Sequence, residues 1–312
     1  MVGILGLIES SNANGFGRHR NVPPASDSTH PPIYPAIAVI VTIVAALVPT
    51  DRLTGPTVIT ATCSAILIGG LPHGALDLAV LRRDACDGIA MVIGLYLSLA
   101  AIMFAIWQIV PVLALAVFLA MAMTHFADDW SDSEHPFFAL GIAVALLSAP
   151  TLFHHGAVSG LFVLLSGKPA ASVLADTLLL VAPAAVACAM LATLLLWHGG
   201  HRVTAVNAVS ALAAMILLPP ITGFAIYFCL IHSPSHFRAG LRRLGSASSV
   251  SQSTIVATLG GLAIALATVQ FLPLADPSSR LFAASFMTLS ILTLPHMAVP
   301  LILRRLGLNA RA

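Results

Sequence analysis

The stretch SVLADTLLLVAPAAVACAMLATLLLW, Ser172–Trp197, decides the fold class of this chain. It exceeds the roughly 20 apolar residues that a helix needs to cross the hydrocarbon core of a bilayer. Gly88–Val110 and Thr254–Leu272 are runs of the same character. Of the 312 residues, 58% are apolar and only 8% are charged, a composition outside the range of soluble domains. The sequence therefore predicts an all-α, polytopic transmembrane helical bundle.

Pro, Gly and charged residues divide the chain into about ten spans, with a range of about eight to ten. The second span is expected to be longer and interrupted. A further apolar stretch, Gly156–Ser166, is too short to cross and is expected to be re-entrant or interfacial. The predicted spans are Pro35–Val48, Thr57–Leu78, Gly88–Val110, Val112–Phe126, Phe137–Phe153, Ser172–Trp197, Thr204–Leu218, Ile221–Phe237, Thr254–Leu272 and Leu281–Leu303.

The positions of the basic residues predict the orientation, because cytoplasmic loops are enriched in Lys and Arg. With the N-terminus inside, all 14 Lys and Arg residues fall on the cytoplasmic side except Arg52, Lys168 and Arg280. Both termini are therefore expected in the cytoplasm, in a multi-pass protein of the plasma (inner) membrane. We expect a disordered cytoplasmic tail (1–34), one transmembrane domain (35–303) and a basic cytoplasmic tail (304–312). The net charge of +2 gives no indication of nucleic-acid binding.

Four histidines lie inside these apolar segments: His73, His125, His232 and His236. Counted from the outer ends of their spans at about 1.5 Å per residue, all four fall within a layer about 7 Å thick in the cytoplasmic half of the membrane. Imidazole is costly to bury without a partner, so ionisable residues at this depth indicate a functional site. His232 and His236, four residues apart, share one helix face, and Pro234 between them is expected to kink that helix. Four imidazoles at one depth predict a metal site.

Three further residues are candidates for the shell outside the metal ligands: Asp77, Asp128 and His296. Asp77 lies one helical turn after His73 and can receive its second ring N–H; alternatively, it faces the cytoplasmic boundary. The acidic run that begins with Asp128 and Asp129 either supplies such a carboxylate or is a solvated loop. His296 is a hydrogen-bonding outer residue or a satisfied core histidine.

Four short motifs resemble the ordered motifs of the Brp/Blh-type β-carotene 15,15'-dioxygenase family. They are GLPHGALD at Gly70–Asp77, His125-Phe126, HSPSH at His232–His236, and LPHM at Leu294–Met297. The resemblance covers about residues 60 to 300. It implies a membrane enzyme that uses O2 to split β-carotene at its central double bond into two molecules of retinal, often for a microbial rhodopsin.

The same resemblance implies which metal is bound and by which residues. Ligand type alone leaves iron, copper, zinc and nickel open, because all of them accept imidazole nitrogen. By resemblance, His73, His125, His232 and His236 map onto the family's iron-coordinating positions, and the cofactor is Fe2+. The substrates are then β-carotene and O2, with β-carotene entering from the lipid bilayer.

Three other functions compete with this one. A di-iron lipid desaturase normally carries several histidine boxes, whereas this chain has one HxxxH pair. A transporter with a proton or metal-ion relay predicts histidines strung across the membrane rather than gathered at one depth. A non-catalytic carotenoid- or retinal-binding membrane protein would share most of the same residues.

Overall fold

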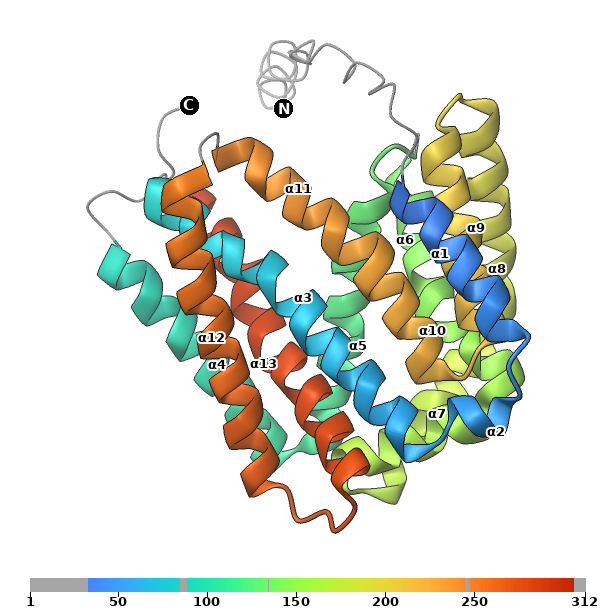
Figure 1. The fold of residues 1–312 in the computed structure, drawn as a ribbon, viewed down its shortest axis with the longest axis horizontal. Coiled ribbons are helices and arrows are strands. Elements are labelled where there is room, and N and C mark those ends of the chain that lie inside the picture. Colours follow the sequence, from blue (N-terminus) through green and yellow to red (C-terminus); the bar gives the residue numbers. More distant parts are fainter. Residues whose placement is uncertain (1–32, 85–88, 134, 245–246, 306–312) are drawn as a thin grey trace, which may run out of the picture. The chain divides into compact units, whose positions relative to one another are not determined.

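In the computed structural model, residues 33–84, 89–133, 135–244 and 247–305 are described, and every regular element within them is a helix. Of the two expected tails, residues 1–32 and 306–312 lie outside these ranges. The elements are α1 (Ile33–Ala46), α2 (Thr50–Leu53), α3 (Pro56–Asp84), α4 (Ile89–Ile109), α5 (Pro111–Phe126), η1 (Ala127–Trp130), α6 (Pro136–Ser148), α7 (Pro150–Ser166), η2 (Pro169–Ala171), α8 (Ser172–His198), α9 (Arg202–Leu217), α10 (Pro220–Tyr227), η3 (Phe228–His232), α11 (Ser233–Leu244), α12 (Ala247–Phe271) and α13 (Pro277–Arg305) (Figure 1).

The lengths of these helices match a membrane environment. Within the described ranges, five segments are long and apolar enough to cross a bilayer, and the bent pair α6–α7 adds a sixth if it is one span. The predicted all-helical class is confirmed for these ranges, and the long apolar helices indicate a membrane protein. The count of about ten spans and the cytoplasmic termini stay predictions. The five segments are Pro56–Leu76, Ala90–Ile109, Pro111–Trp130, Pro169–His198 and Pro277–Ile302, and shorter apolar helices cover Tyr34–Ala46, Arg202–Leu217 and Thr254–Gln270.

Helix α3 differs from its prediction, because it is continuous where an interruption was expected. Pro72 lies inside the helix, where it removes one backbone hydrogen bond without ending the helical path. Gly69 and Gly70, which precede Pro72, instead allow α3 and η3 to approach each other closely. A side chain at Gly70 would overlap the ring of Phe228, and one at Gly69 would contact Cys229. These glycines let α3 pack directly against η3.

The segment from Pro136 to Ser166 also differs from its prediction. A single span over 137–153 was expected, but α6 ends at Ser148 and α7 begins at Pro150, with a bend of 53° between them. Proline is well suited to the first position of a helix, where no N–H is needed, so Pro150 starts a new axis. Within α7, His154 has a non-helical backbone (φ −128°, ψ 30°). The apolar stretch expected to be re-entrant is thus the second half of α7.

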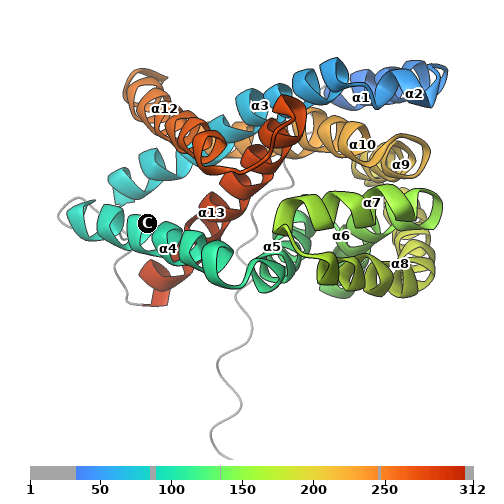
Figure 2. The same ribbon diagram turned by 90° about the horizontal axis from the view of Figure 1, so that it is seen from below.

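Helix α13 lies at the centre of the arrangement that carries the site. It packs against α3, α4, α5, α7 and α12, and Figure 2 shows it crossing between the α3–α12 pair and the α4–α5 pair. Small and hydroxyl residues, including Ala283, Ala284, Ser285 and Ser290, are fully buried along it. Small side chains allow helix axes to approach closely in a membrane bundle.

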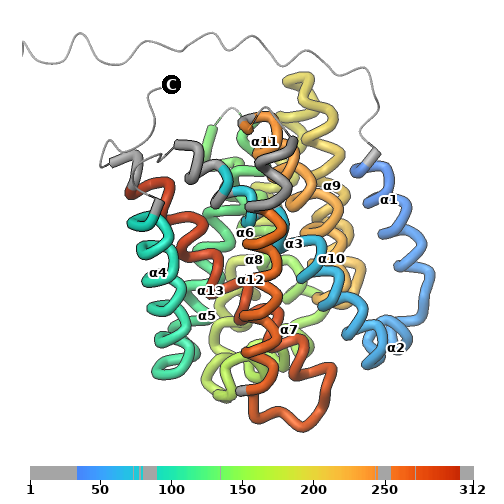
Figure 3. Tube along the Cα trace, turned by 60° about the vertical axis from the view of Figure 1, so that its left-hand side comes forward, coloured from blue at the N-terminus to red at the C-terminus, as the bar shows by residue number. Residues whose placement is uncertain are grey.

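Helix α3 and the α10–η3–α11 segment also pack against each other near the site. These two run side by side in Figures 1 and 3, and α3 contacts all three parts of that segment. The hydroxyl of Ser233 donates to the carbonyl oxygen of Gly69 at 2.5 Å, which fastens the two at the level of the histidines.

Candidate metal centre

Three of the predicted histidines come together between two segments that are far apart in sequence. His125 occupies the last turn of α5, His232 ends η3, and His236 lies in the first turn of α11. Their candidate ligand nitrogens all lie within 4.8 Å of one another, and the rings of His125 and His232 are largely buried. Imidazole nitrogens bind transition metals, so this cluster can hold one metal ion.

The local backbone at His232 follows from the sequence HSPSH. Pro234 has no N–H, so a regular helix would leave the carbonyl oxygen of Leu230 without its partner. The chain instead adopts a π-helical turn over Phe228–His232 before α11 begins. Single π turns inside helices are frequent at functional sites because they redirect side chains. The hydroxyl of Ser235 then donates to the carbonyl oxygen of His232 at 2.7 Å.

Asp129 joins two of the histidines from outside the cluster. Its Oδ2 is 2.9 Å from Nδ1 of His232, and its Oδ1 is 3.0 Å from Nε2 of His236. An ionised carboxylate only accepts hydrogen bonds, so these two ring nitrogens carry the protons. Nε2 of His232 and Nδ1 of His236 consequently keep lone pairs. Carboxylates in this outer position fix the tautomer and ring orientation of metal-binding histidines.

A tyrosine completes the surroundings of Asp129. The hydroxyl of Tyr227 donates to Oδ2 of Asp129 at 2.6 Å, and the tyrosine side chain is fully buried. Its ring packs edge-on against Phe126 at 5.1 Å between centroids. A buried carboxylate is costly unless its lone pairs are satisfied, and one hydroxyl plus two imidazole N–H groups meet that need.

The acidic candidate from the sequence, Asp128, occupies a different position from Asp129. Its Oδ2 is 3.8 Å from Nδ1 of His125, beyond hydrogen-bond range, and its side chain is 71% exposed, against 3% for Asp129. The chain tightens from α5 into the 3-10 helix η1 at this point. That turn leaves Asp128 outside and brings Asp129 and Trp130 inward.

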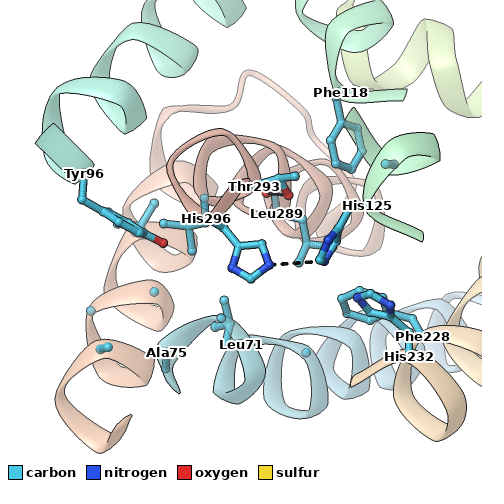
Figure 4. A pocket seen from close by; sticks show the side chains of 18 of the residues that line it. Leu71, Ala75, Tyr96, Phe118, His125, Phe228, His232, Leu289, Thr293 and His296 are labelled. Carbon is cyan, nitrogen blue, oxygen red and sulfur yellow. Dashed lines mark hydrogen bonds between the residues drawn. The ribbon is translucent and has the colours of Figure 1, made fainter. Parts of the chain in front are cut away.

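His296 of α13 lies on the other side of His125. The two Nε2 atoms are 3.3 Å apart, and the ring centroids are 4.7 Å apart at an interplanar angle of 81° (Figure 4). The structure therefore brings the predicted outer residue His296 next to the cluster. The side chains of His73 and Asp77 lie outside the described part of the structure. Residues of α3 on either side of position 73 line a cavity that His125, His232 and His296 also line.

That cavity has a volume of about 260 Å³ and opens directly onto the histidines. His125, His232 and His296 contribute its polar side, together with Tyr96 and Thr293, and the rest of its lining is apolar (Figure 4). The Phe228 ring stacks on His232 at 5.3 Å between centroids. A mostly apolar pocket with a few convergent polar groups is the usual form of a ligand site.

The sequence prediction missed Tyr227 and did not decide between Asp128 and Asp129 as the outer carboxylate. Asp129 follows His125 by four residues, a spacing that places both on one face of a continuing helix. That spacing is the signal that favours Asp129 over Asp128. Tyr227 precedes His232 by five residues, which is a π-helical rather than an α-helical repeat, so no α-helical pattern identifies it.

Comparison with known proteins decides the family. The family model described as "Beta-carotene 15,15'-dioxygenase" matches residues 64–304, more than half of the chain. The chain belongs to the β-carotene 15,15'-dioxygenase family. A protein from uncultured marine bacterium 66A03, named "Beta-carotene 15,15'-dioxygenase", is 30% identical over 251 residues, which cover 73% of this chain and 87% of that relative. No solved structure matches the chain. The matched region of this dioxygenase family member contains all three clustered histidines and His296.

Proposed function

We propose that this chain is an iron-dependent membrane dioxygenase that cleaves β-carotene at its central 15,15' double bond. O2 is the second substrate, and each of the two carbons of that bond receives one oxygen atom, giving two molecules of retinal. Family membership supports the reaction, and the histidine cluster supports a metal. The cell membrane is the proposed location, and a microbial rhodopsin is a proposed recipient of retinal.

The donor set fits the proposed metal. We assign His73, His125, His232 and His236 as the ligands of Fe2+, with Asp129 orienting two of them. Two imidazole nitrogens bound to one ion at about 2.1 Å lie about 3.0–3.4 Å apart, so the nitrogens of the cluster, within 4.8 Å of one another, need only small adjustments. Bound iron would supply the activation of O2, which amino-acid side chains cannot perform.

The chain's own contribution is to bind the polyene, orient the histidines and exclude water. The cavity beside His125 and His232 is lined mainly by leucine, phenylalanine, alanine and glycine. Such a lining gives water few partners and binds hydrocarbon from the bilayer through close van der Waals packing. β-Carotene is about as long as the hydrocarbon core is thick, about 30 Å, so it can enter from the bilayer without crossing water.

The single observation that carries this proposal is the direct junction between the apolar cavity and the histidine cluster. A proton or ion relay requires polar groups along a path through the membrane, whereas His125, His232 and His296 all line one mainly apolar chamber. A non-catalytic carotenoid-binding protein would have the same chamber, and only turnover separates it from the enzyme.

Expression in β-carotene-producing bacteria, with chromatography of the extracted pigments, tests the proposal. The wild-type chain should convert β-carotene to retinal, and His232→Ala should form none while remaining in the membrane fraction. His198→Ala is the matched control, because His198 lies at the exposed end of α8, outside the cluster. Loss of colour without retinal would exclude central cleavage. Unchanged retinal formation in His232→Ala would remove that residue from the ligand set.

A further inference from the structure

A second, smaller cavity lies directly behind the first. The first cavity, called here the histidine cavity, has a volume of about 260 Å³, and the second cavity has about 90 Å³. Both are lined by Phe118, Ala122, Phe126 and Phe224. These four residues form a common wall, and three of them, Phe118, Ala122 and Phe126, belong to the C-terminal half of α5, which also carries His125. His125 lines the histidine cavity next to this wall, because Phe126 follows it directly in the chain.

The chemistry of the second cavity restricts its occupant. Every described residue that lines it is apolar, from Leu115 on α5 and Leu161 on α7 to Phe282 and Phe286 on α13. A cavity without polar groups gives water no hydrogen-bond partner and stays dry or accepts hydrocarbon. A ring-bearing polyene end matches this lining.

The position of the second cavity along α5 matches half of the substrate. Leu115 lines that cavity, and the ten residues from Leu115 to His125 rise about 15 Å along the helix. A carotenoid about 30 Å long that is cut at its centre must extend about 15 Å to either side of the reacting bond. The histidine cavity, at about 260 Å³, falls below the range of about 300–1,000 Å³ that holds drug-sized ligands. It is therefore too small for the whole carotenoid.

Three of the four residues in the wall between the cavities are phenylalanines. Phe118 and Phe224 are each 8% exposed, and Phe224 lies between Phe228, at 5.2 Å, and Phe286, at 5.3 Å between ring centroids. Phe228 in turn stacks on His232. A row of rings thus leads from the histidines into the second cavity.

We infer that the two cavities form one carotenoid tunnel, in which the polyene lies along the histidine cavity and one terminal ring occupies the second cavity. Phe118 and Phe224 turn aside to admit the polyene between them. The depth of the second cavity then sets which double bond stops at the histidines, and so makes cleavage central. This inference rests on the proposed function, and it assigns Leu161 and its neighbours as determinants of substrate length.

Filling the second cavity tests the tunnel. Leu161→Phe and Leu161→Trp place increasing bulk in the second cavity, and Leu180→Trp makes the same change on α8, where Leu180 is 82% exposed. Purified iron-loaded variants are assayed with β-carotene and with β-apo-8'-carotenal, which keeps one ring-bearing half and the central double bond but lacks the far ring. Leu161→Trp should lower kcat/KM for β-carotene by about tenfold or more and for the truncated substrate by less than about threefold. The kcat/KM of Leu161→Phe for β-carotene should lie between those of Leu161→Trp and wild type. The kcat/KM of Leu180→Trp should equal that of wild type for both substrates.

Iron content and yield from the membrane accompany each assay, so that damage to the fold is separated from blockage of the tunnel. Equal loss on both substrates, or no loss on β-carotene in an iron-replete Leu161→Trp protein, would overturn the tunnel. A wild-type chain that forms no retinal would instead overturn the proposed function, which distinguishes the two failures.

Discussion

Tyr227 donates a hydrogen bond of 2.6 Å to the carboxylate of Asp129. The same oxygen atom of Asp129 lies 2.9 Å from Nδ1 of His232. The tyrosine therefore acts on the histidine through a shared acceptor, and the two rings also lie 5.9 Å apart between centroids. Hydrogen bonds in such buried networks depend on one another, so each member has a separate, measurable effect.

Removal of the tyrosine hydroxyl should lower the stability of the fold clearly and the rate of retinal formation only slightly. Tyr227→Phe keeps the ring against Phe126 but withdraws one donor from Asp129, which should destabilise the fold by about 1 kcal/mol. Thermal unfolding in detergent measures this, and retinal formation should fall only modestly. Complete loss of activity with unchanged stability would assign Tyr227 a direct role in the reaction.

Replacement of the carboxylate itself should weaken metal binding. Asp129→Asn presents an amide to His232 or His236 where an acceptor is required, and loss of such an outer partner typically lowers metal affinity about 10–100-fold. Titration with Fe2+ measures the affinity. Asp132→Asn is the matched control, since Asp132 lies in the same loop and its partner is the Thr204 hydroxyl. Equal affinities in the two variants would show that Asp129 does not orient the ligands.

The variant His296→Ala should show whether His296 is an outer hydrogen-bonding residue or a metal ligand. If His296 acts through its 3.3 Å contact with His125, the variant should retain most of its iron while retinal formation slows about tenfold, within the range for misplaced reacting groups. Iron per protein and initial rates are compared with those of His232→Ala. Iron loss as complete as in His232→Ala would make His296 a fifth ligand instead.

Gly70→Ala tests the close approach of α3 to η3. An added methyl group would overlap the Phe228 ring, which stacks on His232, so we expect destabilisation of about 1–3 kcal/mol and reduced activity. Gly160→Ala is the control, because a methyl group there meets no atom within 4 Å, and alanine favours the helix by up to about 1 kcal/mol. A Gly70→Ala protein as stable and active as the control would contradict the proposed packing.

The sequence predicted the helical class and the gathering of His125, His232 and His236, because apolar length and depth counting depend only on helix rise; the same prediction for His73 concerns a side chain outside the described residues. It did not predict how turns rotate side chains. The π turn before His232 places Tyr227 five residues ahead of that histidine, a spacing that no α-helical pattern identifies, whereas the four-residue spacing of His125 and Asp129 does favour Asp129 over Asp128. Pro72 was expected to interrupt α3 because local propensity disfavours it there, whereas the packing of α3 against η3 keeps the helix continuous.

The central claim is that iron bound at this cluster splits β-carotene into two equal halves. The most direct measurement is the ratio of retinal formed to β-carotene consumed by purified protein, with and without Fe2+ and O2. The account predicts two retinal per β-carotene, formed only when both iron and O2 are present, and no product from His232→Ala under the same conditions. Products of unequal length, or full turnover by the protein after iron removal, would contradict it.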